Sequence, residues 1–278
     1  MIFKSQNPFV QLLLLVAGVI MVFPYAQADM IWYPAHSKNK GAISHSGRAP
    51  KLFQLSQSEG AEMFLWKPNL MAMALKEKQS VVALKPTGMD NYHALVAQRA
   101  LAGGGVEAAI RYVYMNGKPS GNSPRLLTAA YKTAFEIIPA PLPREHRRYM
   151  ANHDVVFILR YEGSPVANVA IQLVTTNGTE KTLTSDRSGA VRFSLPDDFA
   201  VTKPGLRNNK PAEFVLSSEN VIKNVRYRTS FSAAYYVDSS HWQSLDMGIA
   251  VLATGFIAGL AINRRNKPIS PKSKRRAT

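Results

Sequence analysis

The segment Val225–Val237 constrains the fold most, because apolar side chains recur at every second position along it, with polar side chains between them as far as Ser232. Its apolar set is Val225, Tyr227, Thr229, Phe231, Ala233, Tyr235 and Val237, and its polar set includes Arg226, Arg228, Ser230 and Ser232. A period of two places the two sets on opposite faces of a strand. The pattern predicts an antiparallel sheet with one face in a hydrophobic core and the other in water.

Several other short apolar runs are bounded by turn residues. They cover 81–84, 92–98, 106–114, 157–161, 169–173, 179–185 and 191–195. Asn177-Gly178 lies between two of them and predicts a hairpin. Strands spaced in this way predict an all-β fold of the Ig-like sandwich type. Two segments are ambiguous: 63–75 is expected to be a short helix, and 126–138 fits either one long strand or part of a helix.

The Pro-rich segment 139–143 is expected to separate two β domains, because proline forces the chain to be extended and cannot donate to a sheet. The predicted domains are 29–138, with an irregular start, and 144–238. The absence of cysteine excludes disulfides, a thiol nucleophile and iron–sulfur clusters.

The N-terminus resembles a cleaved signal peptide over residues 1–28. Lys4 precedes an apolar run from Phe9 to Phe23, and Ala26 and Ala28 form an A-x-A cleavage site. An uncleaved anchor is the alternative. The run is short for a membrane span, which favours cleavage.

The C-terminus predicts a transmembrane helix over residues 245–262, which would extend about 27 Å. The tail at 263–278 carries seven basic residues and no acidic one. Because Lys and Arg concentrate on the cytoplasmic side of spans, we expect a bacterial inner-membrane protein that crosses once. Its body would lie in the periplasm and its basic tail in the cytoplasm.

The basic tail accounts for part of the net charge of +16. Because this part lies next to an apolar segment, the charge favours a membrane protein over a nucleic-acid-binding protein. Within the predicted span, Gly248, Gly255 and Gly259 include a small-x-x-x-small pattern. Such spacing lets two helix backbones approach closely, so pairing with another membrane helix is one prediction. The other is that small residues are simply common in membrane helices.

Three motifs resemble a bacterial family of exported proteins. They are Phe135-Glu136-Ile137-Ile138-Pro139, then Glu162-Gly163-Ser164-Pro165-Val166, and then Thr184-Ser185-Asp186-Arg187-Ser188-Gly189 continuing to Leu195-Pro196. The family has no assigned function and is related to periplasmic components of nickel and cobalt uptake systems. The resemblance implies a transthyretin-like or carboxypeptidase-regulatory-like sandwich over 144–238. It also implies a divalent transition metal as a ligand. Metal-uptake members are expected to place a histidine near the mature N-terminus, whereas the first histidine here is His36.

The candidate metal ligands are Met89, Asp90 and His93, which enter a predicted strand together, and His36 in the irregular start. The alternative for His93 is a hydrogen-bonded structural role, since it shares a strand face with Leu95 and Ala97. His36 would then be a solvated loop residue.

Arg144, Arg147 and Arg148 form a basic cluster beside Glu145 and His146. They predict either a salt-bridge cluster between domains or a site for an anionic ligand or partner. No spacing in the sequence identifies a catalytic constellation, so a non-enzyme is expected. The predicted function is a binding or accessory module of an envelope system, with metal uptake as one version. The alternative is a structural or assembly protein that binds other envelope chains through its helix or its sheet edges.

Overall fold

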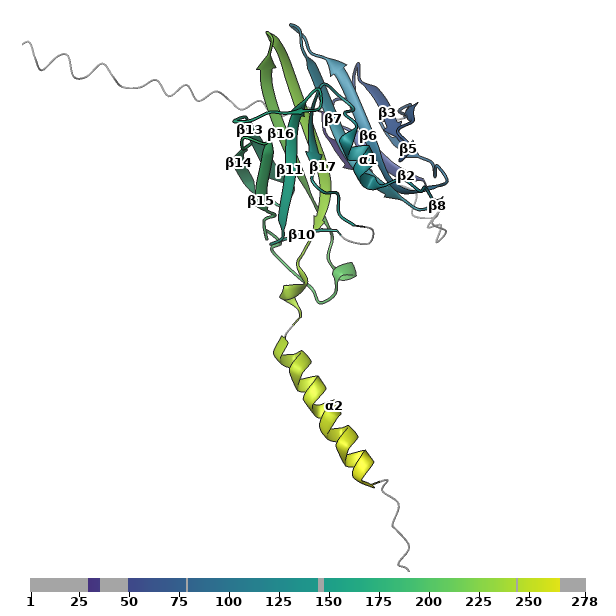
Figure 1. Cartoon of the computed structure of the whole chain (residues 1–278), viewed down its shortest axis with the longest axis vertical. Helices are drawn as coiled ribbons and strands as arrows, with labels where there is room; N and C mark the ends of the chain where they lie inside the picture. Colours follow the sequence, from purple (N-terminus) through teal and green to yellow (C-terminus); the bar gives the residue numbers. More distant parts are fainter. Residues whose placement is uncertain (1–29, 36–49, 79, 145–147, 244, 266–278) are drawn as a thin grey trace, which may run out of the picture.

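The computed structural model describes residues 30–35, 50–78, 80–144, 148–243 and 245–265. The predicted signal peptide, His36, Arg147 and most of the basic tail lie outside these residues. Figure 1 shows a body of β-sheets, here called the β body, and one long helix that extends away from it. The chain is therefore mostly β, with a sandwich-like arrangement and one C-terminal helix.

A central sheet runs through the whole β body. Its main order is β14 (Glu180–Thr184), β13 (Ala170–Thr175), β16 (Ala212–Ile222), β17 (Val225–Tyr236), β7 (Val106–Met115), β6 (Met89–Ala100), β3 (Glu62–Trp66) and β4 (Ala72–Ala74). Neighbours along this path are antiparallel except β17 and β7, which pair in parallel from Tyr227↔Val106 to Phe231↔Ile110. Two short strands complete the sheet: β10 (Tyr149–Met150) pairs with β17, and β8 (Lys118–Pro119) pairs with β6.

A second sheet covers one face of the central sheet. It contains β12 (Ser164–Pro165), β11 (Asp154–Tyr161), β15 (Ala190–Ser194) and β9 (Phe135–Pro139). Helix α1 (Pro124–Ala129) lies beside it and begins at Ser123, whose hydroxyl accepts a hydrogen bond from the Arg125 backbone. The larger hydrophobic core fills the space between the two sheets, and Phe157, Phe214 and Phe231 contact one another at its centre.

A third sheet covers the opposite face. It consists of β1 (Trp32–Pro34), β2 (Lys51–Leu55) and β5 (Val82–Leu84), and it encloses a second core that includes Trp32 and Leu95. The prediction that one face of the 225–237 strand faces water is therefore wrong for Ser230 and Ser232, which are buried. Their hydroxyls donate to the carbonyls of Met30 and Trp32, so β1 replaces water on that face.

The predicted boundary at 139–143 does not coincide with a break in the sheet or in the core. Strand β7 from the first predicted domain pairs with β17 from the second, and β9 pairs with β11. The larger core also draws on both ranges. Pro139 itself is buried within β9. The two predicted domains share one central sheet.

The local predictions had mixed outcomes. The hairpin at Asn177-Gly178 is confirmed, because it joins β13 to β14. The helix expected over 63–75 is wrong, since β3 and β4 form a hairpin there. The range 126–138 divides between α1 and β9.

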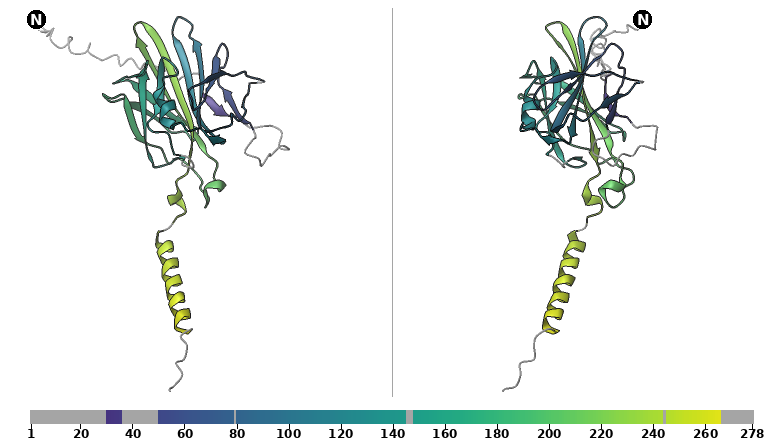
Figure 2. Two further views of the ribbon diagram at one scale, coloured as in Figure 1. Left: turned by 45° about the vertical axis from the view of Figure 1, so that its right-hand side comes forward. Right: turned by 90° about the vertical axis from the view of Figure 1, so that its right-hand side faces the viewer.

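Helix α2 (Leu245–Arg265) follows β17 after a short connection that contains the 3-10 helix η3 (Ser239–His241). Its segment Asp246–Asn263 is long and apolar enough to cross a membrane, and none of it is buried against the β body. The two views in Figure 2 show the helix leaving from the same end of the body. We call this the α2 end. The other 3-10 helix, η2 (Leu206–Asn208), lies in the loop before β16.

Candidate functional site

A cleft opens at the α2 end of the central sheet, where β7 separates from β17. The parallel pairing of these strands stops at Ile110 and Phe231. Further along β17, the short strand β10 pairs with Tyr235 and Tyr236 in the place that β7 has left. Residues from both faces of the sheet therefore line the opening. Its volume is about 770 Å³, within the range of small-molecule sites.

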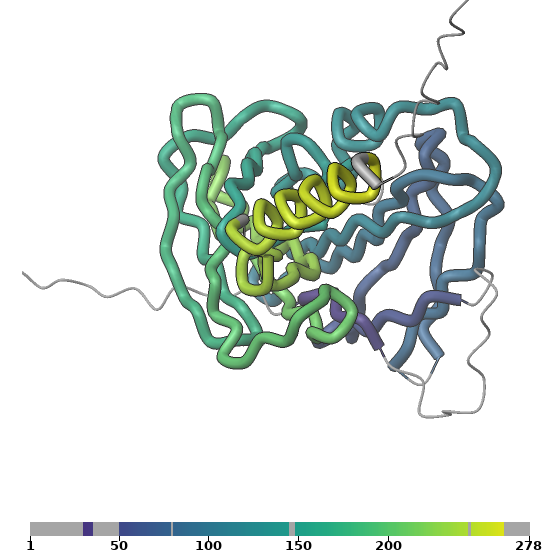
Figure 3. The backbone as a smooth tube through the Cα atoms, turned by 90° about the horizontal axis from the view of Figure 1, so that it is seen from below, coloured from purple at the N-terminus to yellow at the C-terminus, as the bar shows by residue number. Residues whose placement is uncertain are grey.

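We call this opening the β7–β17 cleft. It is lined by Pro34, Lys51, Phe53, Tyr92, Arg111, Tyr112, Val113, Tyr114, Leu142, Pro143, Arg148, Tyr149, Thr176, Lys210, Pro211, Glu213, Phe231, Ala233, Ala234 and Tyr236. Figure 3 looks at the body from the α2 end, from which β17 continues toward the helix. The cleft therefore lies on the side of the body that is nearest to the predicted span.

Among the described residues that line the cleft, four are cations and one is a carboxylate. Arg111 is largely buried and binds Glu213 through two hydrogen bonds, with Nη1–Oε2 at 2.5 Å and Nη2–Oε1 at 3.1 Å. Lys51 donates from Nζ to the Tyr114 carbonyl at 2.6 Å, and burial lowers the pKa of Lys51. Arg111 and Glu213 neutralise each other, so Lys51, Arg148 and Lys210 make the described lining of the cleft positive.

Arg148 and Lys210 are both exposed at this cleft. The Arg148 guanidinium lies over the Tyr236 ring, 4.5 Å from its centroid. Neither side chain forms an ion pair with an acidic residue in the described part of the chain. The predicted anion-binding residue Arg148 therefore lies in a cavity with a second cation, Lys210, which no sequence motif indicates.

The aromatic lining of the cleft is mostly tyrosine. The hydroxyls of Tyr112 and Tyr149 are buried and have no hydrogen-bond partner among the described residues. Burial raises the pKa of Tyr92 to about 12 and the pKa values of Tyr112 and Tyr149 further. These three phenols therefore stay protonated and uncharged near neutral pH.

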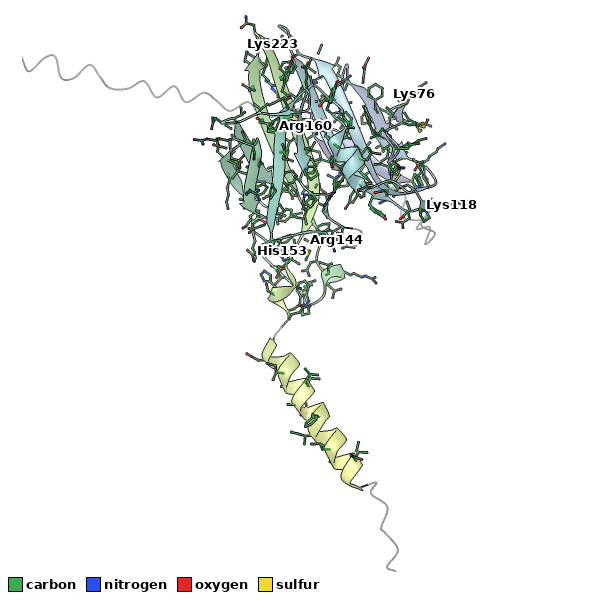
Figure 4. The ribbon with its side chains drawn as sticks, viewed as in Figure 1. Lys76, Lys118, Arg144, His153, Arg160 and Lys223 are labelled. Carbon is green, nitrogen blue, oxygen red and sulfur yellow. The ribbon has the colours of Figure 1, made fainter. Side chains whose placement is uncertain are left out.

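A second cavity of about 850 Å³ adjoins the first and shares Tyr92, Tyr114, Leu142 and Pro143 with it. Arg144 lines this second cavity, so the structure distributes the predicted arginine cluster over two neighbouring cavities. Figure 4 shows Arg144 at the α2 end of the body. Arg147 lies outside the described residues.

The predicted metal ligands are not brought together. Asp90 and His93 lie on opposite faces of β6, and Met89 is about 13 Å from His93 along the strand. Asp90 accepts a hydrogen bond from the Tyr114 hydroxyl at 2.9 Å. The described residues contain no group of three or more histidine or acidic side chains arranged around a metal-sized space.

His93 itself is fully buried and both of its nitrogens are bonded. Nδ1 lies 3.1 Å from the Asn91 carbonyl and Nε2 lies 2.7 Å from the Thr87 hydroxyl. A carbonyl can only accept, so Nδ1 carries the proton and Nε2 accepts from Thr87. Burial lowers the pKa of His93, which favours the neutral ring. This geometry favours the structural alternative for His93.

The three predicted packing glycines all lie on α2. Gly255 and Gly259 are one turn apart on the same face, and Gly248 lies two turns before Gly255. A Cβ added at any of them would meet open space within the described chain. That face is therefore available to another helix.

Sequence reasoning missed a buried charge cluster formed by Lys132, Glu136 and Arg160. Glu136 is fully buried and accepts from Arg160 Nε at 2.9 Å, while Lys132 Nζ lies 3.5 Å from its Oε2. Lys132 and Arg160 also donate to backbone carbonyls of α1 and of the residue after it. The cluster fixes the end of α1 and has a structural role. Glu136, a charged residue within the otherwise apolar strand FEIIP, was the available sign of it.

No family model matches the chain, and no curated protein matches it. Among solved structures, it is similar to a 1.5-MDa bacterial ice-binding adhesin (11% identity, 77% of this chain, 66% of that chain, TM-score 0.24). It is also similar to a Ca²⁺-stabilised adhesin of an Antarctic bacterium (13% identity, 77% of this chain, 50% of that chain, TM-score 0.24). A third similar structure is the D00-D0 domain of Intimin (12% identity, 69% of this chain, 93% of that chain, TM-score 0.22). The chain thus spans about two thirds of the length of the first adhesin structure and about half of the length of the second. At these scores the likeness carries no argument about function.

Proposed function

We propose that the chain is a single-pass protein of the bacterial envelope whose exported β body is a ligand-binding module. The observation that carries the proposal is the course of β17. Its last residues line the β7–β17 cleft, and the chain then continues into the apolar helix α2. An anchor in this position would hold the cleft next to the membrane surface.

The chemistry of the cleft supports a binding role over an enzymatic one. Glu213 is the one carboxylate among the described residues that line the cleft, and both of its oxygens are bound by Arg111. The buried tyrosines remain protonated near neutral pH because burial raises their pKa values. The described lining therefore offers charged and hydrogen-bonding groups that can hold a ligand.

Two sequence features support the proposed orientation. The predicted signal peptide at 1–28 and the basic tail at 263–278 both favour a β body outside the cytoplasm. We do not extend the proposal to nickel or cobalt uptake, because both nitrogens of His93 are already bonded.

The assembly function is a second candidate, favoured by strand β4. This strand is at one edge of the central sheet, and Met71 and Met73 expose about half of their surface there, 58% and 41%. An unpaired edge with exposed apolar side chains can accept a strand from another chain.

The first experiment tests the orientation. Alkaline phosphatase, which is active only in the periplasm, and green fluorescent protein would each be fused after Thr278 in the full chain. We expect fluorescence without phosphatase activity, and an integral protein that resists extraction with alkaline carbonate. Phosphatase activity of the C-terminal fusion, or release by carbonate, would overturn the proposed topology.

The second experiment separates the two functions by photo-crosslinking in intact cells. A photoreactive phenylalanine analogue would replace Tyr236 in the cleft, Met73 on β4, or Tyr131. Tyr131 is an exposed tyrosine outside the cleft and serves as the matched control. An adduct specific to position 236 supports the binding module, and an adduct with a protein specific to position 73 supports assembly. Equal labelling at 236 and 131 would contradict the binding module.

A further inference from the structure

We infer that the β7–β17 cleft binds the phosphate of an anionic amphiphile, with the glycerophosphate head group of a membrane phospholipid as its source. The inference rests on the proposed function, because it names the ligand class of the same cleft. It combines two observations: positive charge without an acidic partner among the described residues, and the position of the cleft at the α2 end.

The charge of the cleft selects an anion. Arg111 and Glu213 neutralise each other, and Arg148 and Lys210 have no acidic partner in the described structure. The Arg148 guanidinium lies over the Tyr236 ring, 4.5 Å from its centroid, at the edge of the cleft. A planar guanidinium of this kind donates two parallel hydrogen bonds to a phosphate, and a lysine adds a point charge.

The deeper part of the cleft is lined by aromatic and apolar side chains. The Tyr112 and Tyr149 hydroxyls are enclosed by protein, so the rings of these residues and not their hydroxyls form the lining. The surrounding rings of Phe53, Phe231 and Tyr236 supply apolar surface for the part of the ligand that carries no charge.

The position of the cleft favours a lipid over a soluble phosphate ester. Tyr236, which lines the cleft, is the last residue of β17, and the chain reaches α2 at Leu245. A body anchored at this end would meet phospholipid head groups at a far higher local concentration than any soluble ester.

The test is a calorimetric titration of the full chain in a neutral detergent. Four probes would be added: short-chain phosphatidylglycerol, short-chain phosphatidylcholine, glycerol 3-phosphate and inorganic phosphate. The test variant is R148A/K210A. The matched control is K118A/K223A, which removes the same charge from exposed residues outside the cleft, at positions labelled in Figure 4. Near-UV circular dichroism would confirm that both variants are folded.

We expect saturable binding of phosphatidylglycerol that is at least about tenfold tighter than that of phosphatidylcholine. R148A/K210A should lose about tenfold or more in affinity, and K118A/K223A should stay within about twofold of the native chain. Binding of glycerol 3-phosphate as tight as that of phosphatidylglycerol would support the phosphate site but overturn the lipid as its source.

The inference is overturned if no probe binds saturably, if both phospholipids bind alike, or if the control variant loses as much affinity as the test variant. Failure here is distinguishable from failure of the proposed function. An adduct specific to position 236 together with a periplasmic body would leave the binding module intact and show that its ligand is not a phosphate.

Discussion

The substitution Glu136→Gln removes the only negative charge from the buried cluster with Lys132 and Arg160. Glu136 and Lys132 have fully buried side chains, and the Arg160 side chain is 7% exposed. The native carboxylate lies 2.7 Å from Arg160 Nη2 and 2.9 Å from Nε, and it also accepts from the Lys132 backbone. The variant would leave two cations in the core without a counter-charge.

The expected cost follows from this burial. Breaking a buried ion pair by neutralising one partner costs about 3–5 kcal/mol. Glutamine keeps one carbonyl oxygen as an acceptor, so we expect the lower end, about 3 kcal/mol. For a body of this size, this corresponds to a fall in melting temperature of about 6–12 °C.

The assay is thermal and urea unfolding of the full chain in detergent, followed by near-UV circular dichroism. The matched control is Glu219→Gln, since Glu219 pairs with Arg228 at 2.9 Å but keeps 26% of its side chain exposed. Exposed pairs contribute at most about 1 kcal/mol. If the two variants unfold within 1 kcal/mol of each other, burial does not control the strength of the Glu136 cluster and the reasoning is wrong.

Three other predictions concern stability and association. Burial lowers the pKa of Lys132 from 10.5 to about 8, whereas the unfolded chain keeps this proton until about pH 10.4. Between pH 8 and 10 the folded chain has released the proton and the unfolded chain still binds it, so the native chain should gain stability relative to Lys132→Met by at most about 1.4 kcal/mol per pH unit. A difference in urea unfolding that stays constant over this pH range would refute this. Gly189→Ala should cost about 1–3 kcal/mol in the same assay, because φ is +72° and the new Cβ would lie 2.7 Å from the Leu159 carbonyl oxygen; an unchanged midpoint would contradict it. Gly255→Leu with Gly259→Leu should abolish crosslinks between α2 and another membrane helix, and crosslinks that persist would exclude this face as the contact.

The sequence alone determined the features that depend on neighbouring residues. The alternation along 225–237 predicts a strand, Asn177-Gly178 predicts a hairpin, and the apolar segment at 245–262 predicts a helix that can span a membrane; β17, the β13–β14 hairpin and α2 agree with these predictions. Each feature is read from side-chain periodicity, turn chemistry or length within a short range. The prediction of a helix over 63–75 is wrong for a local reason as well. Leu70 adopts φ +66° in the tight connection between β3 and β4, and no glycine in the sequence indicates a turn there.

Only the tertiary structure decided which distant strands meet. Whether Ser232 faces water or a buried carbonyl depends on where β1 lies, 200 residues earlier in the chain. The parallel pairing of β7 with β17 joins the two predicted domains, and its end at Ile110 opens the cleft that holds Arg148 and Lys210. The local sequence around a serine or an arginine does not show whether its side chain is exposed to solvent or bonded to another part of the chain. Burial depends on the elements that pack over the residue, and these come from distant parts of the sequence.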